Sequence, residues 1–257
     1  DGKGNGGAFI FNGGSQHTLT MRGFIIQNGY AGKGGGIKIE YSTINLSNLI
    51  VKDNVATNGG AGIYFKYCSG QLSDMDIKDN FNPNGAVASG GGIYAGNSDL
   101  ILNKVNVLDN YAPTSAGGAS FGSDQFASSS TEWYNSVISG NSCLYQSGAI
   151  GFGSWDDTVI LSNLTITGNH IGNTVKGSAD LTMVNCIIWG NAGDTDIEFG
   201  DHQLAGPFNI SYTLLEDGQN SINMPDDSDA LNWGDGNINS NPLFIDAENG
   251  DYRLADY

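Results

Sequence analysis

The chain has 257 residues, enough for one large domain or two small ones. Glycine supplies 39 residues, roughly double the usual share of about 7%, and proline only 5, a composition that excludes collagen. Apolar residues at 39% exclude a disordered chain, and charged residues at 14% argue against long charged helices. The net charge of −17 argues against nucleic acid as a partner. No apolar run reaches the ~18 residues of a membrane span, so we expect no membrane insertion of this segment.

The first predicted strand covers residues 6–11, where two glycines lead into four apolar residues. The same Gly-led pattern returns further along the chain at residues 35–39, 61–65, 91–95, 118–122 and 148–152. Each copy predicts a short strand, in which side chains alternate between the two faces.

Two more predicted strands follow in each period and end at a recurring asparagine. A β-branched residue, two variable residues and Asn occur together six times, and the Asn residues are Asn54, Asn80, Asn110, Asn141, Asn169 and Asn191. Counting back from this Asn, the third, fifth and eighth positions are mostly apolar. The step of two indicates a strand, and the step of three indicates a corner between two strands. The corner carries Asn48, Asn135, Asn163 and Asn185, a residue type that tolerates the left-handed backbone of a bend.

Matched columns at this spacing predict an all-β fold, a right-handed single-stranded parallel β-helix (solenoid) of about seven regular coils. Rungs are expected about 4.8 Å apart. A β-sandwich is the alternative, but hairpins would not produce the same columns in every period. We expect Ile63, Leu72, Met75 and Ile77 to be buried in one coil. The three cysteines are an odd and sparse set, so no disulfide framework is expected.

The regular coils are predicted over residues 1–191. Over residues 192–257 the repeat fades, and we expect irregular final coils of the same solenoid, with an acidic loop at 224–229. The chain begins with Asp rather than Met, so we expect a processed or trimmed chain and treat both ends as possible cuts.

The pairing of Gly-Gly-Ala/Gly-Ile with hydrophobic-x-x-Asn resembles the repeats of polymorphic outer-membrane proteins. A closer resemblance is to the β-helix regions of large secreted proteins of Bacteroidetes-like bacteria. It is carried by residues 23–29, 185–191 and 241–254, with Asn241 standing where that family usually has Asp. The resemblance implies an extracellular or bacterial cell-surface location, and a chain that is a fragment of a longer secreted protein.

Parallel β-helices also include polysaccharide lyases and hydrolases, so this fold alone does not determine function. The histidines lie in no hydrolase-like context, and we predict no catalytic residues. Adjacent carboxylates occur at Asp156-Asp157 and Asp226-Asp227, and both pairs are interpreted as solvated turns. No phosphate-binding loop, zinc-ligand spacing or nucleophile-histidine pattern is present in the sequence.

An aspartate column is the candidate metal site. Asp53, Asp79 and Asp109 each precede the recurring Asn, so register predicts that they stack on three successive coils. Carboxylate oxygens so spaced could bind Ca²⁺, which is the only cofactor considered. The alternative is that Asp simply favours the turn, since Gly takes its place on later coils.

An aromatic row is the candidate ligand site. If Ile63 points inward, Tyr64 points outward, and we expect Tyr94 and Phe121 to take the same place on the next two coils. Exposed stacked rings could contact sugar rings. The alternative is that a loop over residues 124–131 covers them.

These patterns favour a non-catalytic extracellular or cell-surface β-helix segment that acts as an adhesin or spacer and contacts a glycan or a cell-surface partner. A polysaccharide lyase or glycoside hydrolase of the parallel β-helix type is the alternative. A strongly acidic chain makes degradation of a polyanion the less favourable of these functions.

Overall fold

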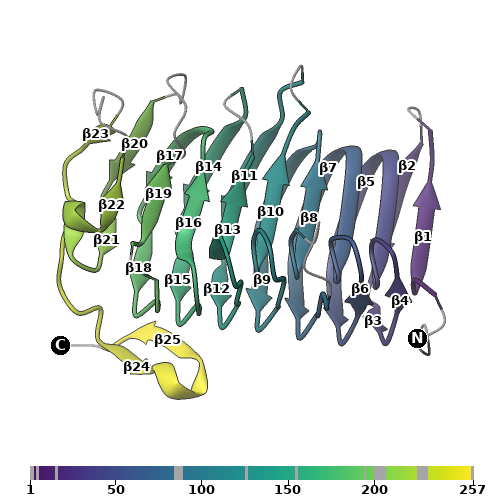
Figure 1. The fold of residues 1–257 in the computed structure, drawn as a ribbon, viewed down its shortest axis with the longest axis horizontal. Helices are drawn as coiled ribbons and strands as arrows, with labels where there is room; N and C mark the ends of the chain where they lie inside the picture. The colour runs from purple at the N-terminus through teal and green to yellow at the C-terminus, as the bar shows by residue number, and fades with distance from the viewer. Residues whose placement is uncertain are drawn as a thin grey trace.

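The repeated sequence columns become repeated strand positions in a computed structural model. As expected, the chain is an all-β parallel β-solenoid. It has about eight turns, where about seven regular coils were predicted, and its strands lie side by side from β1 to β23 (Figure 1). The structure describes residues 3, 6–14, 17–83, 89–124, 127–153, 156–193, 195–199, 207–224 and 231–255.

Three columns of parallel strands line the solenoid, and two long strands, β5 (Ile37–Lys52) and β7 (Ile63–Lys78), run through all three. The Gly-led column otherwise contains β1 (Phe9–Asn12), β8 (Ile93–Gly96), β10 (Ala119–Gly122), β13 (Ser147–Phe152), β16 (Asn173–Gly177), β19 (Ile197–Phe199) and β22 (Ile222–Asn223). The second column contains β2 (Thr18–Arg22), β9 (Asp99–Leu108), β11 (Ser130–Tyr134), β14 (Thr158–Ser162), β17 (Asp180–Val184), β20 (Phe208–Ser211) and β23 (Leu231–Trp233). The third column contains β3 (Ile25–Gln27), the end of β9, β12 (Val137–Ser139), β15 (Thr165–Thr167), β18 (Ile187–Trp189) and β21 (Leu214–Leu215). A small extra pair joins β4 (Tyr30–Ala31) to β6 (Val55–Ala56).

The inward columns form one continuous apolar core. Ile63, Leu72, Met75 and Ile77 are each at most 2% exposed, which confirms the predicted register. The three cysteines are buried and free. Within the described parts of the chain, no helix is both long and apolar enough to span a membrane.

The corners adopt the left-handed backbone that their residue types favour. Asn48, Asn135, Asn163 and Asn185 have φ between 52° and 58°. Asn135, Asn163 and Asn185 also form an exposed side-chain ladder, in which each amide donates to the carbonyl oxygen of the preceding coil's Asn. Asn is therefore selected there by backbone conformation and by hydrogen bonding between coils.

The recurring Asn points inward, which the sequence patterns did not predict. In one central coil, Asn110 donates from Nδ2 to Oδ1 of Asn141 (3.0 Å) and to the carbonyl of Ile77 (2.9 Å). Its own Oδ1 accepts from the backbone N–H and the Nδ2 of Asn80, at 3.1 and 2.9 Å. Equivalent bonds join all members of this buried amide ladder, which are Asn54, Asn80, Asn110, Asn141, Asn169 and Asn191.

The ladder also explains the glycine that leads each inward strand. A Cβ on Gly36, Gly62 or Gly92 would lie only 2.7–3.0 Å from Nδ2 of Asn54, Asn80 or Asn110, respectively. The Gly-led pattern and the recurring Asn are therefore two sides of one contact across the core.

Beyond Asn191 the solenoid continues in register, because β19 to β23 each pair in parallel with the strand one coil earlier. A short 3-10 helix, Gly218–Ser221, lies between β21 and β22. The chain then leaves the rod and forms an antiparallel hairpin of β24 (Phe244–Asp246), the 3-10 helix Ala247–Asn249 and β25 (Asp251–Leu254), visible below the coils in Figure 1. The expected acidic loop, including Asp226-Asp227, lies almost entirely outside the described residues.

Candidate functional site

The structure changes the predicted aromatic row. Tyr64 and Tyr94 are register partners and stack with ring centroids 5.0 Å apart. Phe121 does not join them, because Ser120 is the register partner of Tyr94 and Phe121 pairs with inward Ala95. Phe121 is 4% exposed and packs in the core against Trp133 and Phe152. The assignment of Phe121 to an outward row was wrong, since alternation from Ala119 turns its side chain inward.

The two remaining rings form no open strip. Tyr64 is 3% exposed, and the Nζ of Lys33 lies 5.0 Å from its ring centroid and 3.3 Å from its hydroxyl. Burial raises the pKa of both Tyr64 and Tyr94. The Tyr64–Tyr94 pair therefore contributes packing along the outer wall. Ligand binding by this pair stays a prediction, and Tyr64 offers no accessible ring face for it.

The aspartate column is in place, and the structure supports its turn-forming role. Asp53, Asp79 and Asp109 have φ of 54°, 56° and 54°, the left-handed conformation that Gly140 adopts on the next coil. The carboxylate of Asp53 pairs with Lys52 at 3.0 Å. Among the described residues, no group of three or more His, Cys, Asp or Glu side chains could hold a metal ion. Calcium binding at this column stays a prediction that the geometry does not favour.

The adjacent carboxylates at Asp156-Asp157 are not a fully solvated turn. Asp157 is 3% exposed and accepts hydrogen bonds from the backbone N–H of Ser129 (2.8 Å) and from its hydroxyl (2.9 Å). Asp157 therefore fixes the start of β11 on the preceding coil. The interpretation as a solvated turn was wrong for Asp157, because a polar side chain can be buried where a neighbouring coil supplies hydrogen-bond donors.

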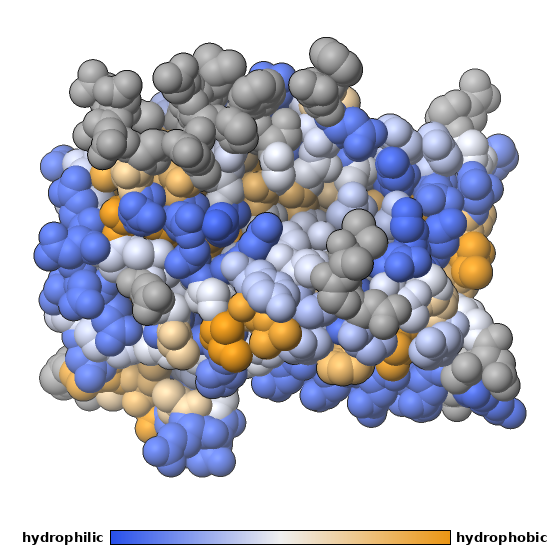
Figure 2. All heavy atoms as spheres, viewed as in Figure 1, coloured by the Kyte–Doolittle hydropathy of each residue, from blue (hydrophilic) through white to orange (hydrophobic). Residues whose placement is uncertain are grey.

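The C-terminal hairpin creates a concave polar surface beside the rod. The Tyr252 hydroxyl lies 2.6 Å from the Ser139 hydroxyl, across 113 residues of sequence. Ser139 and Thr167 occupy outward register positions, yet they are only 7% and 5% exposed. Figure 2 shows apolar and polar side chains mixed where the hairpin lies.

Two clefts flank Tyr252, and together we call them the hairpin clefts. The first has a volume of about 450 Å³ and lies toward the coil of β9; its polar lining residues include Asn106, Asp109, Ser139, Glu248 and Asn249. The second has a volume of about 490 Å³ and lies toward β18; its lining residues include Thr167, Trp189, Asn241, Phe244 and Glu248. The hairpin thus adds aromatic and acidic groups to an otherwise regular strand face.

The electrostatics of the first cleft centre on Asp109. The pKa of the Asp109 carboxyl is raised, mainly by its partial burial and secondly by the nearby negative charge of Asp79. Asn106 is held from both sides, since its Nδ2 donates to Asp76 (3.0 Å) and its Oδ1 accepts from the Val137 N–H (3.0 Å). The cleft therefore offers fixed hydrogen-bonding groups and a negative field.

Sequence reasoning missed these clefts because the hairpin lies outside the repeat. Tyr252 belongs to a segment noted only for its resemblance to secreted proteins, and Trp189 was noted only as part of a repeat motif. The one available signal was the outward column itself, in which Leu108, Ser139, Thr167 and Trp189 follow one another. In this column the small residues Ser139 and Thr167 lie between the large apolar residues Leu108 and Trp189, a pattern that suits a strand face covered by another segment of the chain.

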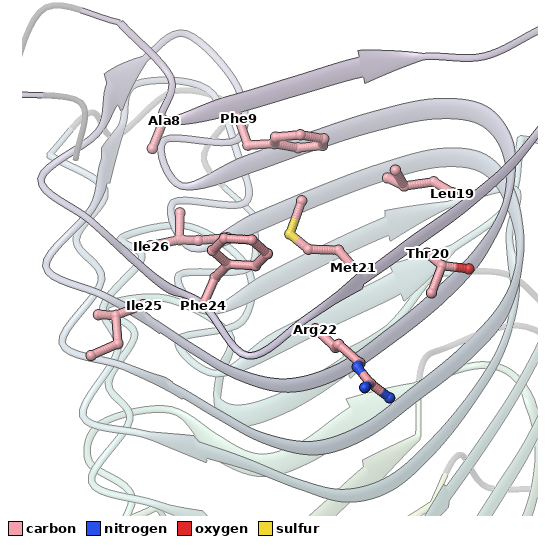
Figure 3. A pocket seen from close by; sticks show the side chains of 9 residues that line it. All are labelled: Ala8, Phe9, Leu19, Thr20, Met21, Arg22, Phe24, Ile25 and Ile26. Atoms are coloured by element: carbon pink, nitrogen blue, oxygen red, sulfur yellow. The ribbon is translucent and has the colours of Figure 1, made fainter.

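A second concave surface lies at the N-terminal end of the rod. Phe9, Leu19, Met21 and Ile26 converge on an apolar cavity of about 570 Å³, while Ile25 points away from it (Figure 3). These side chains belong to the first coil, so the cavity is the open end of the core.

A further buried carboxyl directly precedes β19. Asp196 is 7% exposed, and burial raises its pKa to about 7. Its Oδ2 has no hydrogen-bond partner among the described residues. The side chain stands where earlier coils have the ladder-facing glycine, one coil beyond Thr174.

No family model matches the chain, and no curated protein matches it. Among solved structures, a chain of QnrB1, a plasmid-mediated fluoroquinolone resistance protein, aligns at 13% identity over 88% of this chain and 97% of its own, with a TM-score of 0.24. A similarity this distant carries no argument about function.

Proposed function

We propose that this chain is a non-catalytic segment of an extracellular or cell-surface β-helix protein, as its resemblance to bacterial secreted proteins implies. It acts as a rigid spacer or adhesin and contacts a glycan in the hairpin clefts. The observation that carries the proposal is the pairing of Trp189 and Tyr252 with fixed polar groups in one concave region.

The chemistry of the hairpin clefts suits a sugar. The apolar C–H face of a pyranose packs on an aromatic ring, and its hydroxyl rim hydrogen-bonds to carboxylates and amides such as Glu248 and Asn106. The clefts are wide enough for a short saccharide rather than a single small ion.

Charge narrows the class of glycan. Asp109 and Glu248 line the first cleft, and no Lys or Arg is among its lining residues in the described part of the chain. An acidic glycan would be repelled, so the expected ligands are neutral saccharides or those with amino groups.

The test is a glycan array followed by calorimetry on the best neutral binder. Trp189→Ala should weaken binding about fivefold, because an aromatic contact of this kind contributes on the order of 1 kcal/mol. Tyr145→Ala is the matched control, since Tyr145 is 73% exposed and does not line the clefts. Array binding that is unchanged by Trp189→Ala, or no glycan bound at all, would leave only the spacer role.

The hydrolase alternative has one observation in its favour, which is that Asp109 and Glu248 line the same cleft. Glycosidases use two carboxyl groups on opposite sides of the scissile bond, and a raised pKa suits the acid. Release of reducing sugar by the wild type, abolished in both Asp109→Asn and Glu248→Gln, would establish that alternative. Binding without release supports the non-catalytic proposal.

A further inference from the structure

The outer face of the Gly-led column contains a small cavity in the middle of the rod. The cavity has a volume of about 140 Å³ and lies over β10, β13 and β16, which are neighbouring strands (Figure 1). Ser120, Gly151 and Lys176 are register partners on these strands and all line the cavity. Within the described residues, the cavity shares no lining residue with the hairpin clefts, so it is a separate site.

The glycine at the centre of this cavity is not required by the backbone or by packing. Gly151 does not adopt a left-handed φ. A Cβ on Gly151 would come no closer than 3.4 Å to another described atom, which is an ordinary contact, whereas a Cβ on Gly62 would lie 2.6 Å from the carbonyl oxygen of Gly92. Gly153, which also lines the cavity, would likewise accept a Cβ with contacts of 3.5 Å or more. Glycine in a strand that neither φ nor packing requires marks a place where a ligand approaches the backbone closely.

A buried hydroxyl faces the same space. Ser147 is 0% exposed, it lines the cavity, and its Oγ has no hydrogen-bond partner among the described residues. The Oγ atoms of Ser147 and Ser115 each lie 3.7 Å from the position that a Cβ on Gly151 would take. Between Ser147 and Ile150 the strand β13 contains one residue more than its partner β16, and such an irregularity re-aims side chains. A buried hydroxyl without a partner is unfavourable, so a ligand that hydrogen-bonds to it gains affinity.

The other polar groups around the cavity suit a neutral, hydroxylated ligand. Hydroxyl and amide side chains such as those of Ser120, Ser178 and Gln146 both donate and accept hydrogen bonds, as sugar hydroxyls do. The charge of Lys176 is balanced by Glu198 at 3.0 Å, so the cavity has no free cation to select an anion. A volume of about 140 Å³ is well below the roughly 300–1,000 Å³ of pockets for drug-sized ligands, and it therefore suits one sugar ring rather than an oligosaccharide.

We propose that this cavity, which we call the glycine pocket, binds the terminal sugar residue of a neutral glycan. The C–H face of the ring packs on the bare backbone of Gly151, and its hydroxyls hydrogen-bond to Ser147 and the neighbouring polar side chains. The glycine pocket lies on a different strand column from the hairpin clefts, so one rod can hold glycan chains at two sites. Binding in the glycine pocket does not depend on binding in the hairpin clefts.

Nuclear magnetic resonance titration with neutral methyl glycosides tests the proposal, and the probes are those of glucose, galactose, mannose and N-acetylglucosamine. At least one probe at millimolar concentration should shift the backbone amide signals of Gly151 and Gly153. The same shifts should appear in Trp189→Ala, which weakens the hairpin clefts alone, so that failure at one site is distinguished from failure at the other. No shift with any neutral probe, or stronger binding of methyl glucuronide or inorganic phosphate at these glycines, would overturn the proposal.

Two variants separate a ligand-binding role from a structural one. Gly151→Ala introduces a methyl group without a close contact, so the melting temperature should not fall, while binding measured at Gly153 should weaken about tenfold or more. Ser147→Ala removes a hydroxyl that has no partner among the described residues, so it should also leave the melting temperature unchanged and weaken binding about fivefold.

Gly32→Ala is the matched control for these variants. A Cβ on Gly32 would meet no described atom closer than 3.6 Å, and Gly32 does not line the glycine pocket, so binding should equal that of wild type. A lower melting temperature in Gly151→Ala would assign this glycine to packing. Unchanged binding in Ser147→Ala would mean that water alone satisfies the hydroxyl. Either result would overturn the proposal.

Discussion

Replacing a central member of the buried amide ladder should destabilise the whole rod. Asn110→Ala removes the Nδ2 donor to the Ile77 carbonyl and the Oδ1 acceptor that serves two N–H groups of Asn80. Asn80 keeps one bond from its Nδ2 to Val51, so the backbone N–H of Asn80 and the carbonyl of Ile77 are the groups left unpaired. A buried unpaired polar group costs about 1–3 kcal/mol, and two of them predict a loss of about 2–6 kcal/mol.

Urea titration of wild type and variant measures this loss as a change in the free energy of unfolding. Asn45→Ala is the control, because Asn45 is exposed on the second column of strands, and its replacement should cost less than about 0.5 kcal/mol. A loss below about 1 kcal/mol in Asn110→Ala would refute the reasoning, since it would mean that water or neighbouring groups satisfy the same atoms.

Three other predictions concern single side chains. The pKa of Asp196 is raised from 3.8 to about 7, so the folded state binds the extra proton and stability should fall as pH rises from about 4 to 7, by at most about 4 kcal/mol. Asp196→Asn should remove most of this slope in melting temperature against pH, and an unchanged slope would locate the effect elsewhere. Asp79→Gly should change the free energy of unfolding by less than about 1 kcal/mol, because glycine adopts the φ of 56° without strain. Asp79→Val should lower the free energy of unfolding by about 1–3 kcal/mol, because a β-branched residue is strained at this φ. Equal losses in the two variants would contradict the turn-forming role of Asp79. Ile77→Ala leaves a cavity in the core and should lower the unfolding free energy by about 2–5 kcal/mol, with exposed Ile101→Ala as the comparison.

The fold could be predicted because apolar side chains at Leu72, Met75 and Ile77 repeat with the strand period in every coil. Phe121 was misplaced for a related reason. Ala119 takes the inward position of Ile93, and strict alternation then places Phe121 inward, where the small side chain of Ala95 on the neighbouring coil leaves room for it. In β10 the large side chain of Phe121 was matched to the outward aromatic rings of the preceding coils, but the two-residue alternation of the strand turns it inward.

The parts that could not be predicted depend on contacts between distant segments. The position of the recurring Asn was found from spacing, but its inward direction depends on glycines such as Gly62, which lie across the core. The hairpin that carries Tyr252 folds back over strands more than 100 residues earlier, and no periodic signal in the sequence records that return.

The buried amide ladder has a consequence for how the rod opens. The ladder begins beside Gly29, whose backbone N–H donates to Asn54, and after Asn191 the equivalent position is Gly218, which has no side chain to extend it. Central coils are therefore tied to neighbours on both sides, and terminal coils on one side only. Amide hydrogen exchange should accordingly be fastest in the first and last coils and slowest near Asn110, so that unfolding proceeds inward from the ends.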